Sequence, residues 1–134
     1  MKKRVLIVGA KGKMGLAVSN ILENDYEVIK IDKGDLIDDF KADLVIDFGS
    51  AESSVLSAEY CIKQKVPLIV GSTGQNDSQI KKIQEVSKVA PLMICSNFSL
   101  GMILVKKCIE NILKISPEDI IVFEKHHRAK KRYP

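Results

Sequence analysis

The feature that most constrains the fold of this chain is an apolar run that leads directly into three glycines spaced three apart, VLIVGAKGKMG at residues 5–15. Residues 5–8 are aliphatic without alternation, as in a strand that is buried on both faces. Gly9 would permit a tight turn, Gly12 the close approach of a ligand, and Gly15 close packing of the next helix. The N-terminus of that helix would present free N–H groups and the positive end of its dipole, so the pattern predicts a phosphate-binding loop.

An acidic residue follows the next expected strand. That strand covers residues 26–31 and ends on Asp32, at roughly the 20-residue interval expected for an acid that binds an adenine ribose hydroxyl. Taken singly, Asp32 could be an ordinary turn residue. Lys33 comes next, and this cation could meet a 2′-phosphate or be an exposed surface charge. The two residues favour dinucleotide binding and leave NADH and NADPH both open as cofactors.

The composition indicates one globular domain with an aliphatic core. The chain has 134 residues, of which 46% are hydrophobic and 28% are charged, and it has no tryptophan. This length can bury a core but is short for a cofactor domain together with a substrate domain. The first strand begins close to Met1, and no apolar run approaches the roughly 20 residues of a membrane span. We therefore expect a cytoplasmic protein without a signal peptide or a membrane partner.

The cysteines and histidines do not form a metal-binding pattern. Cys61, Cys95 and Cys108 are odd in number, lie in or beside apolar segments and have no CxxC spacing, so we expect buried, reduced thiols. His126 and His127 are adjacent, and adjacent side chains on a strand point apart. No further ligand is spaced to complete a site, so no bound metal is expected.

Positive charge is concentrated near the C-terminus, while the formal net charge is +4. Such a cluster is most often a solvated face and next most often a site for nucleic acid or an acidic ligand. Tyr133 is the only aromatic residue nearby and no nucleic-acid-binding motif is present, so no nucleic-acid partner is expected. The cluster consists of Lys125, His126, His127, Arg128, Lys130, Lys131 and Arg132.

Strand and helix patterns alternate along the chain. Helices are expected after the glycine loop, after an N-cap at Ser50, after residue 76 or 77, and over residues 99–115. This alternation predicts an α/β fold, a Rossmann-like doubly wound parallel sheet with helices on both faces. Right-handed crossovers would bring the loops that follow the strands to one edge of the sheet, where they would line a crevice. The strands are expected at residues 5–8, 26–31, 44–48, 67–70, 91–95 and 119–124.

Five motifs of the chain belong together as a set. They are GAKGKMG at 9–15, VIDFGS at 45–50, VGSTG at 70–74, SNFSLGM at 96–102 and EKHHRAKK at 124–131. In this order they resemble the 4-hydroxy-tetrahydrodipicolinate reductase family. This resemblance implies NADH- or NADPH-dependent reduction of 4-hydroxy-tetrahydrodipicolinate to tetrahydrodipicolinate in the diaminopimelate route to lysine, with a small dicarboxylate as substrate.

The pattern and the resemblance together assign roles to individual residues. The resemblance implies that His126 and Lys130 act in proton transfer and that His127 contacts substrate. Hydride delivery to an unsaturated ring leaves electron density that a proton must quench, which suits these residue types. Ser72 departs from the family's GTTG loop but keeps a hydroxyl. The expected cofactor-binding residues are Gly9, Lys11, Gly12, Lys13, Met14, Asp32, Lys33, Gly71, Ser72, Thr73, Ser96, Asn97 and Phe98.

The end of the chain departs from the family pattern. After the HHxxK lysine the family typically continues with an aspartate and a PSGT segment that binds a substrate carboxylate, whereas this chain has Lys131, Arg132, Tyr133 and Pro134. We therefore interpret residues 1–124 as the dinucleotide-binding domain and 125–134 as the start of a substrate-binding segment. Two hypotheses follow, an active reductase or a cofactor-binding fragment without turnover. The homotetramer of the family is doubtful for a chain this short.

Overall fold

The computed structural model describes residues 2–116 together with 119, 121 and 123. The chain divides into two compact units, residues 1–96 and residues 97–134. The first unit holds every described strand. The second holds one described α-helix. Each unit is described by itself.

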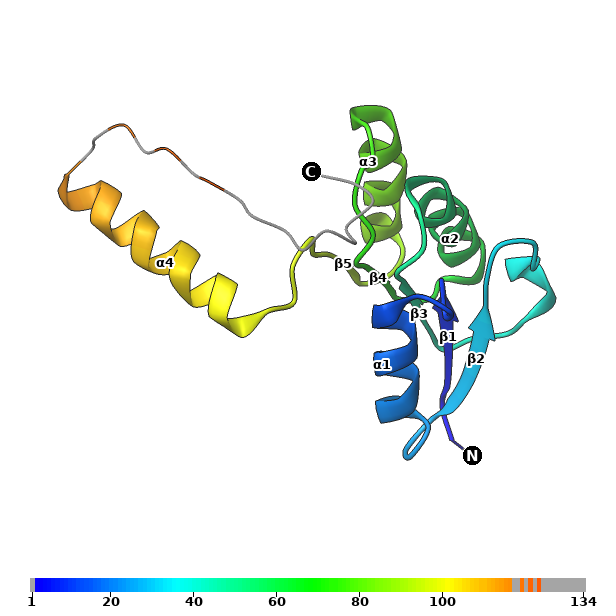
Figure 1. The fold of residues 1–134 in the computed structure, drawn as a ribbon. Helices are drawn as coiled ribbons and strands as arrows, with labels where there is room; N and C mark the ends of the chain where they lie inside the picture. The colour runs from blue at the N-terminus through cyan, green and yellow to red at the C-terminus, as the bar shows by residue number, and fades with distance from the viewer. Residues whose placement is uncertain (1, 117–118, 120, 122, 124–134) are drawn as a thin grey trace. The chain divides into compact units, whose positions relative to one another are not determined.

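The first unit is built on a five-stranded parallel sheet (Figure 1). Its strand order is β2-β1-β3-β4-β5, so β1 pairs with β2 on one side and with β3 on the other. The inner strands are therefore β1, β3 and β4, which explains why their sequences are apolar without alternation. The strands are β1 (Arg4–Val8), β2 (Glu27–Ile31), β3 (Leu44–Asp47), β4 (Leu68–Val70) and β5 (Leu92–Ile94).

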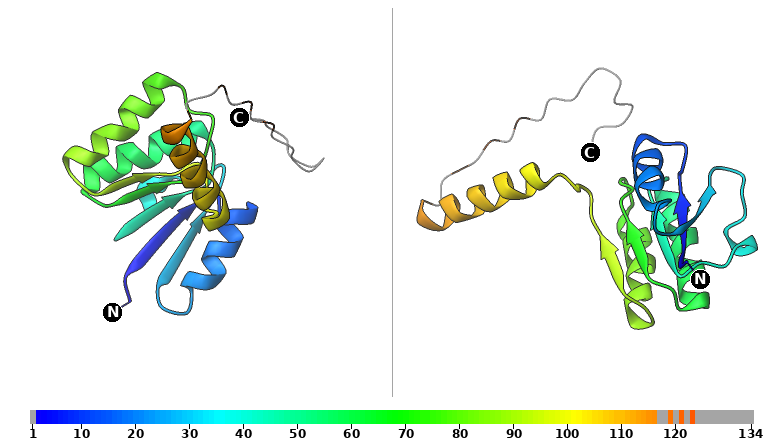
Figure 2. Two further views of the ribbon diagram at one scale, coloured as in Figure 1. Left: turned by 90° about the vertical axis from the view of Figure 1, so that its left-hand side faces the viewer. Right: turned by 90° about the horizontal axis from the view of Figure 1, so that it is seen from below.

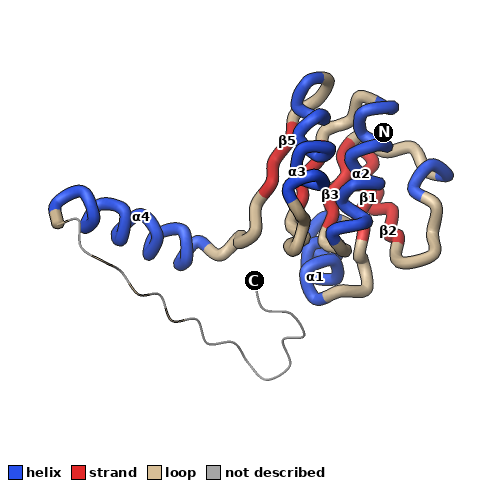
Figure 3. The backbone as a smooth tube through the Cα atoms, turned by 90° about the horizontal axis from the view of Figure 1, so that it is seen from above, coloured by secondary structure: helices blue, strands red, loops and turns tan. Residues whose placement is uncertain are grey.

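Helices cover both faces of this sheet. The views of Figures 2 and 3 place α1 (Lys13–Leu22) on one face and α2 (Ala51–Gln64) with α3 (Asp77–Gln84) on the other. The chain continues from α3 into a 3-10 turn, η2 (Glu85–Lys88), and a second 3-10 turn, η1 (Ile37–Asp39), lies between β2 and β3. The predicted doubly wound α/β fold is confirmed.

Alternate side chains of the strands feed two separate cores. On β1, Leu6 and Val8 belong to the core beneath α2 and α3, whereas Val5 and Ile7 belong to the core beneath α1. On β3, Val45 and Ile46 divide in the same way. Both faces of the inner strands are thus removed from water, and this burial supplies the main driving force for folding.

Side-chain caps set the start of two helices in this unit. The Ser50 hydroxyl accepts a hydrogen bond from Ser53 N, and the Asn76 side chain accepts one from Gln79 N. In both cases the side chain of the third helical residue also accepts from the backbone of the capping residue, which completes a capping box. The expected cap at Ser50 and a cap at residue 76 are confirmed.

The second unit contains α4 (Leu100–Ile115), with Ser99 as its N-cap. No residue of α4 is buried, and large apolar side chains such as Leu100, Leu104 and Ile112 are more than half exposed. The predicted sixth strand, at residues 119–124, lies largely outside the described residues. The three residues described there are in no strand.

The cysteines follow the prediction only in part. All three are free, but Cys61 is buried, Cys95 is partly exposed and Cys108 is exposed. The expectation of three buried thiols is therefore wrong for Cys108, which lies on α4, where no residue is buried among the described residues.

None of the helices in the described part of the chain has the length and apolar character that a membrane span requires.

Candidate functional site

The loops that follow the strands of the first unit meet at the carboxyl edge of the sheet. Backbone hydrogen bonds continue beyond the strand ends and hold each loop to its neighbour. Four of these bonds run from Gly9 N to Ile31 O (3.0 Å), Phe48 N to Val8 O (2.9 Å), Gly71 N to Asp47 O (2.8 Å) and Cys95 N to Val70 O (2.9 Å). The predicted convergence is confirmed for the loops of this unit.

Two of the three glycines in the first loop are required by the fold. Gly9 has a φ of +76°, and a β-carbon on it would lie 2.7 Å from Gly49 N. A β-carbon on Gly15 would overlap the Gly9 carbonyl and the Ala10 backbone. At Gly12 the nearest atom, Gly9 O, would be 3.3 Å away. A β-carbon at position 12 would therefore make a tight contact, although a looser one than at Gly9 or Gly15. A glycine there also lets a ligand approach the backbone closely.

The N-terminus of α1 has no side-chain cap. Its N-cap is Gly12, and its first turn contains no acidic residue. The other three α-helices of the described chain are capped by Ser50, Asn76 and Ser99. Helix N-termini carry unpaired N–H groups and partial positive charge. The exposed Lys11 and Lys13 add cationic side chains beside this end, so the site fits an anionic group such as a pyrophosphate.

Asp32 lies at the end of β2 beside the glycine loop. Its Oδ2 accepts a hydrogen bond from Lys11 N and its Oδ1 accepts one from Lys33 N, each at 2.9 Å. These two backbone donors lower the pKa of Asp32, in that order of effect. The carboxylate is therefore ionised at neutral pH, and a charged acceptor lies where the sequence predicted one.

A buried carboxylate that sequence reasoning did not single out lies at the end of β3. Asp47 is fully buried. Its Oδ1 accepts from Gly49 N at 2.9 Å and from Ser53 Oγ at 3.2 Å, and its Oδ2 accepts from Ser57 Oγ at 2.7 Å. Burial raises the pKa of Asp47, and these donors partly oppose the increase. The sequence does carry a signal for this buried group. Asp47 ends an apolar strand, and Ser53 and Ser57 lie four residues apart on one face of the next helix.

The side chain of Gln75 holds the loop of residues 71–74 through hydrogen bonds. The Gln75 Nε2 group donates to Ser72 Oγ at 2.9 Å, to Ser72 O at 3.2 Å and to Ser54 Oγ at 3.1 Å. Ser72 is buried, whereas Thr73 and Gly74 are exposed. The Ser72 hydroxyl thus faces the protein interior, and Thr73 lies on the solvent side of the loop. Sequence reasoning did not single out Gln75.

The remaining predicted residues fall in different parts of the chain. Ser96 is exposed just after β5. Asn97 and Phe98 belong to the second unit, where Asn97 Oδ1 accepts a hydrogen bond from Ser99 N at 2.8 Å. The predicted catalytic and substrate-binding residues, His126, Lys130 and His127, lie outside the described residues.

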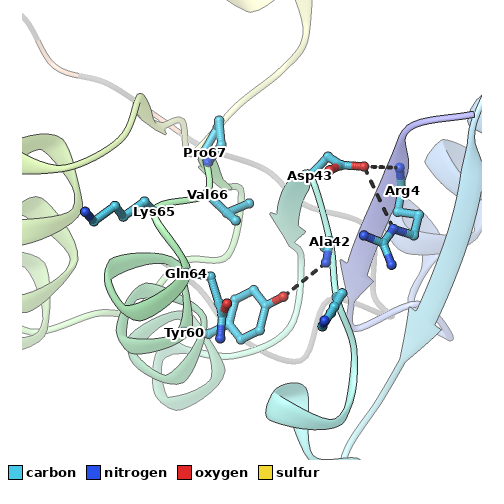
Figure 4. Close-up of a pocket in the computed structure, with 9 residues that line it drawn as sticks. Arg4, Ala42, Asp43, Tyr60, Gln64, Lys65, Val66 and Pro67 are labelled. Atoms are coloured by element: carbon cyan, nitrogen blue, oxygen red, sulfur yellow. Dashed lines mark hydrogen bonds and ion pairs between the residues drawn. The ribbon is translucent and has the colours of Figure 1, made fainter.

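A cleft at the opposite, amino edge of the sheet has a different character (Figure 4). There the Asp43 carboxylate accepts a hydrogen bond from Arg4 N at 2.7 Å. The Tyr60 hydroxyl donates to Phe40 O at 2.9 Å and accepts from Ala42 N at 3.1 Å. These groups bind one another, and a dinucleotide binds at the carboxyl ends of the strands in folds of this kind. The carboxyl edge is therefore the candidate cofactor site.

Comparison with known proteins gives a consistent result. The family model described as "Dihydrodipicolinate reductase, N-terminus" matches residues 28–98. A 4-hydroxy-tetrahydrodipicolinate reductase of Buchnera aphidicola subsp. Cinara cedri is 40% identical over 92 residues, which are 67% of this chain and 34% of that protein. The enzyme of the same name from Caldanaerobacter subterraneus subsp. tengcongensis is 31% identical over an alignment that covers 100% of this chain and 59% of that protein.

Solved structures support the fold. Dipicolinate-bound dihydrodipicolinate reductase from Paenisporosarcina sp. TG-14 superimposes with a TM-score of 0.67 at 22% identity, over 84% of this chain and 54% of that one. Aspartate dehydrogenase from Thermotoga maritima gives a TM-score of 0.56 at 19% identity, over 80% and 51% respectively. The chain thus spans less than two thirds of the length of each of these relatives.

Proposed function

Because this chain belongs to the dihydrodipicolinate reductase family, whose N-terminal part it matches over residues 28–98, we propose that it binds a nicotinamide dinucleotide along the carboxyl edge of its sheet. We further propose that the bound cofactor serves the reduction of 4-hydroxy-tetrahydrodipicolinate to tetrahydrodipicolinate in lysine biosynthesis. The observation that carries the proposal is the hydrogen bond that Lys11 N donates to the Asp32 carboxylate at 2.9 Å. It lies beside a helix N-terminus that no side chain caps.

The described residues divide the work of holding the cofactor. The N–H groups at the start of α1 bind the pyrophosphate, and Gly12 allows it to approach the backbone. The Asp32 carboxylate accepts hydrogen bonds from the adenine ribose hydroxyls. The pyrophosphate lies over the end of β1, so the other half of the molecule extends over the loops that follow β3 and β4.

When bound, the reduced nicotinamide supplies a hydride. Conversion of 4-hydroxy-tetrahydrodipicolinate to tetrahydrodipicolinate consumes this hydride and one proton and releases the 4-hydroxyl oxygen as water. We assign delivery of the proton to His126 and Lys130, with His127 contacting the substrate. Histidine and lysine suit the role because both can donate a proton near neutral pH when their surroundings tune them. The cationic side chains around them would attract a dicarboxylate substrate.

The choice between NADH and NADPH depends on two adjacent residues. Asp32 favours the free 2′-hydroxyl of NADH and repels a 2′-phosphate, whereas the exposed Lys33 side chain attracts one. We propose that the chain binds both cofactors. A Lys33→Ala variant should weaken NADPH binding several-fold and leave NADH binding nearly unchanged, and this difference should shrink at high salt.

The test combines binding with turnover. NADH and NADPH are titrated into the chain while nicotinamide fluorescence is followed, and oxidation of the cofactor is then measured with freshly prepared 4-hydroxy-tetrahydrodipicolinate. Saturable binding with turnover supports the full proposal. No affinity for either nucleotide would overturn it.

A second candidate function is cofactor binding without turnover. It is favoured by one observation, that the site formed by the described residues consists of groups suited to holding the cofactor. A catalytic protein should bind a dicarboxylate such as dipicolinate more tightly when the cofactor is present, because the two ligands share one site. Cofactor binding without turnover and without this cooperative effect would favour the second function.

A further inference from the structure

The loop of residues 71–74 is tied to α2 through one side-chain amide. Gln75 Nε2 reaches both the hydroxyl and the carbonyl oxygen of Ser72, and it also reaches Ser54 Oγ on α2. Ser54 is fully buried, and its hydroxyl donates to Ala51 O at 2.8 Å. Gln75 therefore connects a cofactor-edge loop to the buried first turns of α2.

The Ser72 hydroxyl that accepts from Gln75 also lies near the Asp47 carboxyl group. The Ser72 hydroxyl is near enough to this carboxyl to lower its pKa, although less than Ser57, Gly49 and Ser53 do. Asp47 is itself held by Ser53 and Ser57 from α2. Ser72 is thus placed between a carboxylate on one strand and an amide anchored on a helix, and the position of the loop depends on both.

We propose that Gln75 is a positioning residue for the half of the dinucleotide that extends beyond the pyrophosphate. The inference rests on the proposed function. A dinucleotide lies across the point where the strand order reverses, here between β1 and β3, so its second half lies over the loops after β3 and β4. Gln75 fixes the loop of residues 71–74 before the ligand binds. Binding therefore does not have to supply the free energy of ordering this loop, and the affinity is higher.

A purely structural role for Gln75 would be less consistent with its surroundings. Its side chain is only partly buried. The cap of α3 is formed by its neighbours Asn76 and Gln79, which exchange hydrogen bonds at 2.9 Å. Loss of the Gln75 amide therefore leaves the helix start and both cores in place, and it releases only the loop.

The test compares two alanine variants and two ligands. Gln75→Ala is the variant of interest. Gln79→Ala is the matched control, because it removes the same amide four residues later, where it serves only the cap. The ligands are NADH and ADP, since ADP occupies the pyrophosphate and adenine part of the site but has no second half.

We expect Gln75→Ala to raise the dissociation constant for NADH about tenfold, as for one loop residue that must be ordered on binding, and that for ADP less than about twofold. Gln79→Ala should change both constants less than about twofold. A Gln75→Ala protein that binds NADH like the parent chain, or that loses affinity for both ligands equally, would overturn the inference. If the parent chain binds neither ligand, the proposed function itself fails.

A second variant guards against misfolding of the first. Ser54→Ala removes the acceptor on the helix side, so it should weaken NADH binding in the same direction. The double variant Gln75→Ala/Ser54→Ala should bind NADH as Gln75→Ala does, because both changes break one connection. Additive effects would show that the two residues act separately and would contradict the inference. Thermal unfolding of each variant shows whether it is folded.

Discussion

Gly9 lies directly against Gly49, so that a β-carbon on Gly9 would come within 2.7 Å of Gly49 N. The turn after β1 and the turn after β3 are therefore in backbone contact. Asp47 holds the second turn through its hydrogen bond with Gly49 N at 2.9 Å. The glycine loop is thus supported by the turn after β3 as well as by its own helix, so the two turns hold each other in place at the carboxyl edge of the sheet.

The three glycines of the first loop should respond differently to alanine. Gly15→Ala forces a β-carbon into the Gly9 carbonyl, and Gly9→Ala adds strain from its positive φ, so each should lower the free energy of unfolding by about 3 kcal/mol. Gly12→Ala should destabilise the chain less than the other two changes, because its β-carbon would meet Gly9 O at 3.3 Å. It should also lose NADH affinity, because the glycine lets the pyrophosphate approach the backbone closely. Urea denaturation and NADH titration measure the two effects. Equal destabilisation by all three would contradict this division.

Asp32 should order the glycine loop before any ligand binds. In Asp32→Asn, the amide cannot accept from both Lys11 N and Lys33 N with the strength of a carboxylate. The Lys11 N–H should therefore exchange with deuterium faster than in the parent chain, and NADH affinity should fall about tenfold. Asp38→Asn is the control, because Asp38 is an exposed partner of Lys63. Unchanged exchange at Lys11 would show that the hydrogen bond does not order the loop.

Asp47 should make stability depend on pH. Burial raises its pKa in the folded chain above the ordinary value of 3.8, so the folded protein binds this proton more tightly than the unfolded chain does. The stability that protonation contributes is present below 3.8 and is lost as the pH rises through the raised pKa. The free energy of unfolding of the parent chain should therefore fall relative to that of Asp47→Asn as the pH rises from 3.8 through the range of the raised pKa. Denaturation of both proteins across this range provides the measurement.

The control for this measurement is Asp43→Asn, which makes the same change just before the other end of β3, where the side chain is 48% exposed. The difference in free energy of unfolding between Asp43→Asn and the parent chain should not show the pH dependence seen with Asp47→Asn. A pH-independent difference for Asp47→Asn would show that the carboxyl titrates alike in the folded and unfolded states.

The buried thiol of Cys61 and the exposed thiol of Cys108 should react at very different rates. Burial, with a smaller contribution from Asp47, raises the pKa of the Cys61 thiol to about 12, so at neutral pH the nucleophilic thiolate is scarce and shielded. Cys108 is exposed. With a thiol reagent, the native chain should label rapidly at Cys108 and label Cys61 only after unfolding, as mass spectrometry of peptides would show. Rapid labelling of Cys61 in the native state would mean that its environment opens readily.

Local sequence patterns were enough for the order of the elements in the first unit. Aliphatic runs without alternation marked the inner strands. Ser50, and either Asn76 or Asp77, marked helix starts, because each pattern reflects contacts within a few residues. The same reasoning placed Asp32 correctly beside the glycine loop. It did not find Gln75, whose three acceptors include Ser54, 21 residues away, and such a partner leaves no periodic trace in the sequence.

The glycine spacing, the strand and helix periods and the helix caps were determined by the sequence alone, since they depend on backbone sterics and on burial along one element. Only the tertiary structure decided what surrounds each polar group. It buried Asp47 among hydroxyls, turned Ser72 toward Gln75, and showed that a β-carbon on Gly12 would be less crowded than one on Gly9 or Gly15. The physical reason is that desolvation and close contact depend on atoms brought together from distant parts of the chain.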